Sequence, residues 1–84
     1  MDVATFEQRV FEVDGVLIRI RASKSDKVDD FNYNRAASGT TTVSDWMRTR
    51  ILPSIGNFEC DVISGQYGQV HGNTQLERLR STYR

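Results

Sequence analysis

The stretch RVFEVDGVLIRIRA, residues 9–22, constrains the fold more than any other part of the sequence. Two runs rich in β-branched and aromatic residues flank Asp14-Gly15, a dipeptide that tolerates the positive φ angles of a two-residue hairpin turn. The pattern predicts strands at about 5–13 and 16–22. Alternation with a period of two then assigns to the core face Phe11, Val13, Val16, Ile18 and Ile20. The opposite face carries Leu17, Arg19 and Arg21.

The middle of the chain reads as a loop followed by a helix. A charged stretch follows Ala22 and indicates a loop, and the sequence leaves open whether Phe31 or Tyr33 starts a third, weaker strand near 31–36. Apolar residues at helical spacing then predict a helix near 43–52, which Pro53 stops; these residues are Val43, Trp46, Met47 and Ile51.

The C-terminal part predicts one more strand and one more helix. The stretch FECDVISG indicates a strand at about 58–64. Thr74 and Glu77, three residues apart, form a capping-box pattern that begins a final helix. Leu76, Leu79 and Tyr83 fall on one stripe of that helix and are expected to face the core.

These elements predict one domain over residues 1–84 with the order β-β-(β)-α-β-α. The fold class is α+β, a small antiparallel or mixed sheet with two short helices packed on one of its faces. A chain of 84 residues has room for a single core. Cys60 and His71 are the only cysteine and histidine, so neither an intramolecular disulfide nor an ordinary zinc site is expected.

The charge and hydropathy of the sequence limit the classes of partner that we expect. Eleven basic and 11 acidic residues give zero formal net charge, so no whole-molecule field attracts nucleic acid or an anionic membrane. The N-terminal stretch lacks the pattern of a signal peptide, and no apolar run is long enough to span a bilayer. We therefore expect a cytoplasmic protein, in agreement with the single free thiol, and no cofactor or membrane partner.

The glycine-rich stretch SGQYGQVHGNTQLERLR, residues 64–80, raises the question of an anion site. Glycines before a helix start can let backbone N–H groups approach a phosphate. The residues of this hypothesis are Gly68, Gly72, Thr74 and Arg78. The spacing matches neither a P-loop nor a dinucleotide fingerprint. The sequence favours a plain connection, in which Gly65 ends a strand and Gly72 turns the chain into the capped helix.

Catalytic chemistry has weak support. Cys60 and His71 would make a nucleophile and base only if the fold brought them together. Cys60 alternates with Phe58 and Val62, which predicts a buried thiol. Asp26, Asp29 and Asp30 lack the ligand spacing of a calcium loop. We expect no enzyme activity and no metal site.

A nucleic-acid platform is the alternative function. Arg19 and Arg21 project from one strand face, and further aromatic and basic residues could add stacking surfaces and charge: Tyr33, Arg35 and Tyr67. The arginines of the chain look dispersed, so a solvated face with scattered ion pairs is the favoured interpretation.

Association is the function that the sequence favours. A small sheet in so short a chain has exposed edges, and proteins rarely leave a long apolar edge strand open. We expect a small, non-enzymatic interaction module that self-associates, in the first instance as a homodimer. Nucleic-acid binding is the second hypothesis, and anion or nucleotide binding by the Gly65–Arg78 loop is the third.

Overall fold

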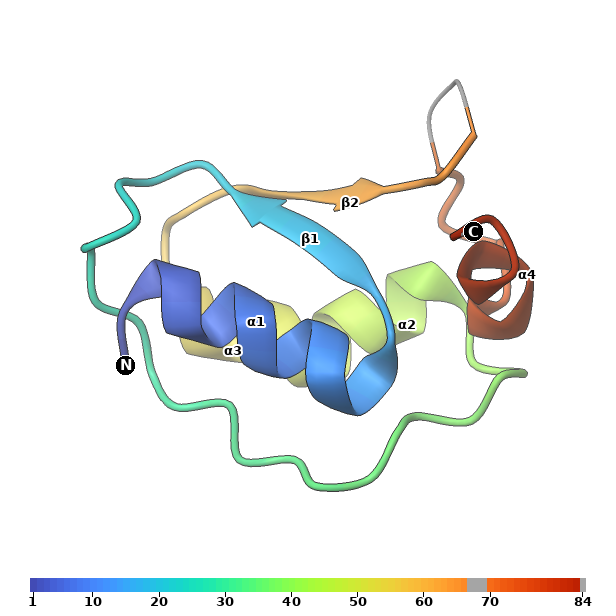
Figure 1. Cartoon of the computed structure of the whole chain (residues 1–84), viewed down its shortest axis with the longest axis horizontal. Coiled ribbons are helices and arrows are strands. Elements are labelled where there is room, and N and C mark those ends of the chain that lie inside the picture. The colour runs from blue at the N-terminus through green and yellow to red at the C-terminus, as the bar shows by residue number, and fades with distance from the viewer. Residues whose placement is uncertain (67–69, 84) are drawn as a thin grey trace.

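A computed structural model describes residues 1–66 and 70–83. Its elements in chain order are α1 (Val3–Asp14), β1 (Leu17–Ile20), α2 (Val43–Trp46), the π-helix η1 (Met47–Ile51), α3 (Leu52–Ile55), β2 (Cys60–Ile63) and α4 (Leu76–Arg80). β1 and β2 form a two-stranded antiparallel sheet. Figure 1 shows α1, α2 and α3 beneath this sheet, with α4 near one end of it. The α+β class is confirmed, with two strands and an N-terminal helix in place of the predicted first strand.

The prediction of a strand at 5–13 is wrong, because these residues lie in α1. Asp2 caps the helix, its carboxylate accepting the Thr5 N–H at 2.8 Å, which lowers the pKa of Asp2. Gly15 ends the helix at φ 66° and donates its N–H to the Phe11 carbonyl. The glycine does take a positive φ angle, but it forms a helix C-cap and no hairpin turn.

The buried stripe of α1 explains why helix prevails there. Val3, Phe6 and Val10 recur at helical spacing and are fully buried, whereas Phe11, which was expected in the core, is 46 % exposed. The short alternating run around Phe11 has strand propensity, but burial of the helical stripe against the rest of the core outweighs such local preferences.

The two observed strands are shorter than predicted, and the alternation in β1 is confirmed. Ile18 and Ile20 face the core, and Leu17 and Arg19 face outward. In the register of the sheet, Arg19 lies opposite Asp61 and Ile18 opposite Val62. The helices cover one face of the sheet, so the outward face remains exposed.

A long connection joins β1 to α2 and runs past the helices on the side away from the sheet (Figure 1). Residues 31–36, where the sequence left a third strand open, form no strand in the described chain. Phe31 instead anchors the connection: it is buried and packs edge-on against Phe6, with ring centroids 5.5 Å apart. A single buried aromatic residue thus replaces strand pairing.

The helical segment after Thr42 continues beyond Pro53, which was expected to stop it. Pro53 has no N–H for a helical bond to the Thr49 carbonyl. A π-turn precedes it, in which the Leu52 N–H bonds to the Met47 carbonyl, and the Tyr33 hydroxyl donates to the Thr49 carbonyl at 3.3 Å. The chain therefore passes the proline without leaving that carbonyl unpaired.

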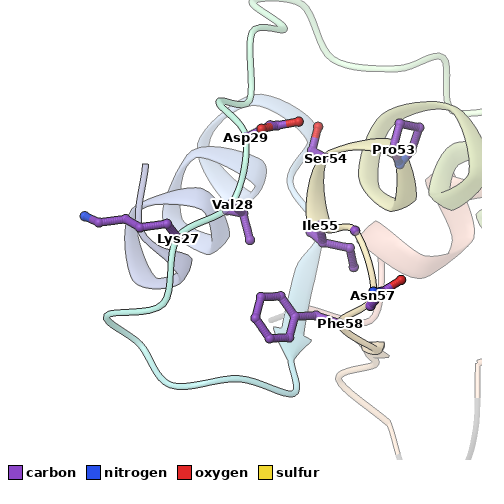
Figure 2. A pocket seen from close by; sticks show the side chains of 9 residues that line it. Lys27, Val28, Asp29, Pro53, Ser54, Ile55, Asn57 and Phe58 are labelled. Carbon is purple, nitrogen blue, oxygen red and sulfur yellow. The ribbon is translucent and has the colours of Figure 1, made fainter.

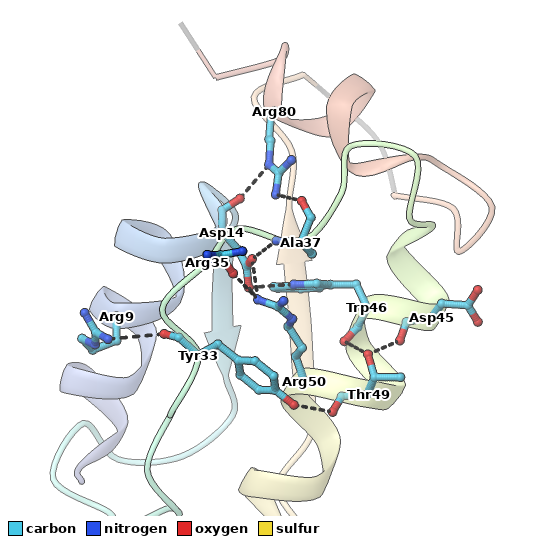
Figure 3. Close-up of polar contacts among 10 residues, drawn as sticks. All are labelled: Arg9, Asp14, Tyr33, Arg35, Ala37, Asp45, Trp46, Thr49, Arg50 and Arg80. Atoms are coloured by element: carbon cyan, nitrogen blue, oxygen red, sulfur yellow. Dashed lines mark hydrogen bonds and ion pairs between the residues drawn. The ribbon is translucent and has the colours of Figure 1, made fainter.

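Asp14 is the buried polar centre of the molecule (Figure 3). Its fully buried carboxylate accepts from Trp46 Nε1 at 2.9 Å, from the Ala37 N–H at 2.7 Å and from Arg50 Nη1 at 3.0 Å. Arg80 donates to the carbonyls of Asp14 and Ala37 at 2.7 and 2.9 Å. This cluster joins α1, the long connection, the α2–η1 segment and α4.

The C-terminal segment closes the end of the sheet. Leu76 and Leu79 are buried as predicted, and Tyr83 is half-buried. The Tyr83 hydroxyl accepts the Leu17 N–H at 3.2 Å and donates to the Ile63 carbonyl. It thereby bridges the ends of β1 and β2, and its burial raises the pKa of the phenol.

Candidate protein-interaction site

The hydrogen-bond pattern of the sheet defines its open edges. The Arg21 N–H donates to the Glu59 carbonyl at 2.8 Å, just beyond the strand ends. In an antiparallel ladder, hydrogen-bonded pairs alternate with pairs whose N–H and C=O groups point away from the partner strand. The backbone groups of Ile18 and Ile20 on β1, and of Cys60 and Val62 on β2, therefore point outward.

The outer edge of β1 is partly covered. The Ile20 N–H donates to the Glu7 carboxylate at 2.8 Å, and the Ile20 carbonyl accepts from the Ala22 N–H at 2.9 Å. Lys24 completes the arrangement by pairing with the same Glu7 side chain at 2.5 Å. A side chain of α1 thus occupies the edge where another strand would bind.

The outer edge of β2 is open. Within residues 1–66 and 70–83, no group bonds to the outward N–H and C=O of Cys60 or Val62. Edge groups of this kind can accept a strand from another chain. We call this row of backbone groups, with the side chains of residues 60–64, the β2 edge.

A groove of about 480 Å³, lined by both polar and apolar residues, lies beside the β2 edge. Its lining residues come from α2 and η1, from β2 and from the chain leading to α4: Val43, Ser44, Met47, Cys60, Asp61, Val62, Val70 and Gly72. Met47, Val62 and Val70 are each partly exposed while packing against the core. A strand added at the β2 edge would thus cover apolar side chains as well as backbone groups.

The thiol of Cys60 lines this groove and is only half-buried, whereas the sequence predicted full burial. Desolvation, followed by the nearby carboxylates of Asp61 and Glu7, raises the pKa of Cys60 to about 12. The thiol is therefore protonated at neutral pH and a poor nucleophile. His71 lines a different depression, so the groove does not combine the two.

The fold places only some of the residues of the anion hypothesis in one depression. Thr74 and Arg78 line a polar depression of about 380 Å³ with Thr42, His71, Asn73 and Gln75, while Gly72 lines the β2 groove. Gly68 lies outside the described residues. The predicted capping box is wrong: Gln75 takes the N-cap position of α4, without a side-chain bond, and the helix is five residues long.

Close packing accounts for two of the glycines. A Cβ at Gly65 would lie 1.8 Å from the Thr82 carbonyl oxygen, so the two backbones touch there. A Cβ at Gly72 would lie 3.1 Å from the Ser44 Cβ. These contacts favour the interpretation of the stretch as a connection between β2 and α4.

The residues of the nucleic-acid hypothesis do not form one surface in the described chain. Arg21 is engaged by Asp61 at 2.9 Å and by Glu59 at 3.0 Å, which raises the pKa of Arg21 and lowers that of Asp61. Arg19 is exposed on the same face of the sheet. The Arg21 guanidinium is thus already paired with carboxylates.

Tyr33 and Arg35 belong to the long connection, away from the sheet. The Arg50 guanidinium lies over the Tyr33 ring, 4.2 Å from its centroid, and Arg50 Nη1 donates to the Arg35 carbonyl at 2.8 Å (Figure 3). Tyr67 lies outside the described residues. The Tyr33 ring, which the sequence grouped with Arg19, is therefore in contact with Arg50 instead.

A larger depression of about 600 Å³ lies between residues 27–29 and 53–58 (Figure 2). The ring of Phe58 points toward Val28, whereas Lys27 points away. The Asp29 N–H donates to the Ser54 carbonyl at 2.9 Å across one side of it. The backbone groups named here are bonded within the chain, unlike those of the β2 edge.

The β2 edge was only partly foreseeable. The sequence indicated exposed strand edges, but the side on which β2 is open depends on its pairing with β1, which no local pattern reveals. Among the described residues, no cluster of histidine, cysteine and carboxylate side chains could hold a metal ion. In the same residues, no helix has the length and apolar character needed to cross a bilayer.

Comparisons with protein-family models, with curated proteins and with solved structures found no match to this chain.

Proposed function

We propose that this chain is a small, non-enzymatic protein-interaction module that self-associates through the β2 edge. The observation that carries the proposal is the row of outward N–H and C=O groups at Cys60 and Val62, which have no partner among residues 1–66 and 70–83 and lie beside a groove lined in part by apolar side chains. Strand addition uses this combination, because main-chain hydrogen bonds give affinity and neighbouring side-chain sites give specificity.

The energetics favour a second strand at this edge. The outward N–H and C=O groups that have no partner among the described residues can form hydrogen bonds with the peptide groups of an added strand. Covering the Met47 and Val70 side chains adds a hydrophobic contribution of about 25 cal/mol for each Å² of apolar surface removed from water. Zero formal net charge means that two copies do not repel each other at long range.

A non-enzymatic role is supported by the state of the candidate catalytic groups. Cys60 has a raised pKa and is protonated at neutral pH. The carboxylate of Asp14 is buried and already accepts hydrogen bonds from three different donors, which leaves it unsuited to proton transfer with a substrate.

Light scattering tests the proposal directly. We expect the mass of a dimer from micromolar to hundreds of micromolar concentration. Val62→Pro removes the outward N–H without touching the ladder to β1, so it should yield a folded monomer, whereas Val62→Ala retains that N–H and should still associate. Circular dichroism establishes that both variants are folded. A monomeric mass for the unmodified chain at every concentration would refute self-association.

The groove has its own matched pair of variants. Met47→Glu places a charge beside the β2 edge and should weaken association. Leu52→Glu replaces a residue that is 45 % exposed and is not part of the groove lining, so it should leave the mass unchanged. Equal effects of the two substitutions would show that association does not use this groove.

A further inference from the structure

The side chains of β2 restrict how two copies can pair, if they associate through this strand as proposed above. Two antiparallel copies related by a twofold axis place one residue opposite itself, and we call this residue the pivot. The pivot determines every other pair along the two strands. Residues 60, 61, 62 and 63 are the possible pivots within β2.

Charge argues against two of these pivots. With Asp61 as pivot, the two Asp61 carboxylates would lie directly opposite each other. With Cys60 as pivot, Asp61 would lie opposite Glu59 of the second copy. Like charges directly opposite each other destabilise a strand pair. Arg21 lowers the pKa of Asp61, so this carboxylate stays ionised at neutral pH.

The path of the chain after β2 argues against Ile63. With Ile63 as pivot, the hydrogen-bonded pairs would need residues 64–66 as extended strand. The Gly65 N–H donates instead to Thr82 Oγ1 at 2.9 Å, and the Gln66 N–H to Ser64 Oγ at 3.0 Å. The chain is thus already bent toward the C-terminal segment.

Val62 satisfies both conditions. As pivot, it sets Asp61 opposite Ile63 of the second copy, and Cys60 opposite Ser64, so no like charges meet. On the core side, it aligns a row of β-branched residues across the axis, in the order Ile18, Val62, Val62, Ile18. Such rows stabilise sheets through cross-strand contacts.

We propose that the partner is a second copy of this chain, bound by antiparallel β2–β2 pairing with Val62 on the twofold axis. The result is a continuous four-stranded sheet in the order β1, β2, β2, β1. The grooves of the two copies then face each other across the axis and cover each other.

A single-cysteine scan measures the pivot. In a Cys60→Ser background, Asp61→Cys, Val62→Cys and Ile63→Cys are oxidised at a concentration at which light scattering shows the mass of a dimer. A pivot residue meets its own copy at a Cα separation of about 5.5 Å or less, within the range that a disulfide spans. We expect Val62→Cys to form the covalent dimer fastest, although the side chains at 61 and 63 are more exposed.

The possible results distinguish a wrong pivot residue from a failure of self-association. A dimeric sample in which Asp61→Cys or Ile63→Cys cross-links fastest would overturn the Val62 pivot and leave self-association standing. A monomeric mass with slow cross-linking of all three variants would overturn both.

The unmodified chain provides a second measurement that does not depend on the variants. In a mixture of two isotope labels, NMR should show an intermolecular Hα–Hα contact between Asp61 of one copy and Ile63 of the other. A contact between the two Asp61 residues in its place would overturn the proposed pivot.

Discussion

Asp14 connects most of the fold through one side chain and one carbonyl. Its carboxylate is fully buried and lies 3.0 Å from Arg50, which is itself 17 % exposed. Breaking a buried pair by removing one partner is costly, because the remaining charge stays in a poorly solvated place. The same substitution also leaves Trp46 Nε1 without its acceptor.

We therefore predict that Asp14→Ala lowers the free energy of unfolding by about 3–5 kcal/mol, as measured by urea titration. Asp14→Asn, which keeps an acceptor but loses the charge, should fall between this variant and the unmodified chain. Glu59→Ala removes an exposed partner of Arg21 and serves as the control, with little expected change. A loss for Asp14→Ala no larger than that of the control would contradict this role.

At the scale of elements, the helix caps differ from those that the sequence suggests. Thr42 caps α2, with its hydroxyl accepting the Asp45 N–H at 3.3 Å. Thr74 precedes the N-cap of α4 and contributes only backbone bonds, to Val43 and His71. Substituting each threonine by alanine therefore distinguishes the loss of a helix cap, at Thr42, from the loss of a side chain that caps no helix, at Thr74.

Thr42→Ala should cost about 1 kcal/mol of stability, as is typical of a lost N-cap. Thr74→Ala should stay within about 0.5 kcal/mol of the unmodified chain, as for an ordinary surface change. Thermal or urea unfolding of both variants gives the comparison. A larger loss at Thr74 would mean that the predicted capping box forms in solution.

Several elements of the fold could be predicted from the sequence. Alternation in β1, the burial of Leu76 and Leu79, and the start of a helix after Thr42 follow from local periodicity and are confirmed, whereas the predicted end of that helix at Pro53 is not. The strand predicted at 5–13 is wrong because Asp14-Gly15 fits both a hairpin turn and a helix end. Only burial of the Val3 and Phe6 stripe against distant residues decides between them.

The candidate site shows the same limit. The sequence indicated open strand edges, but Glu7 covers part of the β1 edge, whereas no group of residues 1–66 and 70–83 bonds to the β2 edge, and this difference arises from packing. The hypothesis that grouped Tyr33 with Arg19 treated the aromatic side chain as free. In the fold, Tyr33 stacks with Arg50, a contact between positions too far apart in the chain for local patterns to reveal.

At the scale of the whole molecule, we propose that one sheet edge determines what the protein does. The exposed face of the sheet carries an ion pair, Arg21 with Asp61, and an exposed apolar pair, Leu17 opposite Ile63. The opposite face is covered by helices. The β2 edge is therefore the direction in which this small sheet can grow.

Amide hydrogen exchange of the unmodified chain, followed by NMR at low and high protein concentration, tests this claim most directly. The N–H groups of Asp61 and Ile63 point toward β1 and should be protected at both concentrations, which makes them the internal control. The N–H groups of Cys60 and Val62 should also be protected at both concentrations, because the dimer is expected from micromolar concentration upward and a second copy bonds to them. Rapid exchange of Cys60 and Val62 at every concentration, with Asp61 and Ile63 protected throughout, would contradict self-association through this edge.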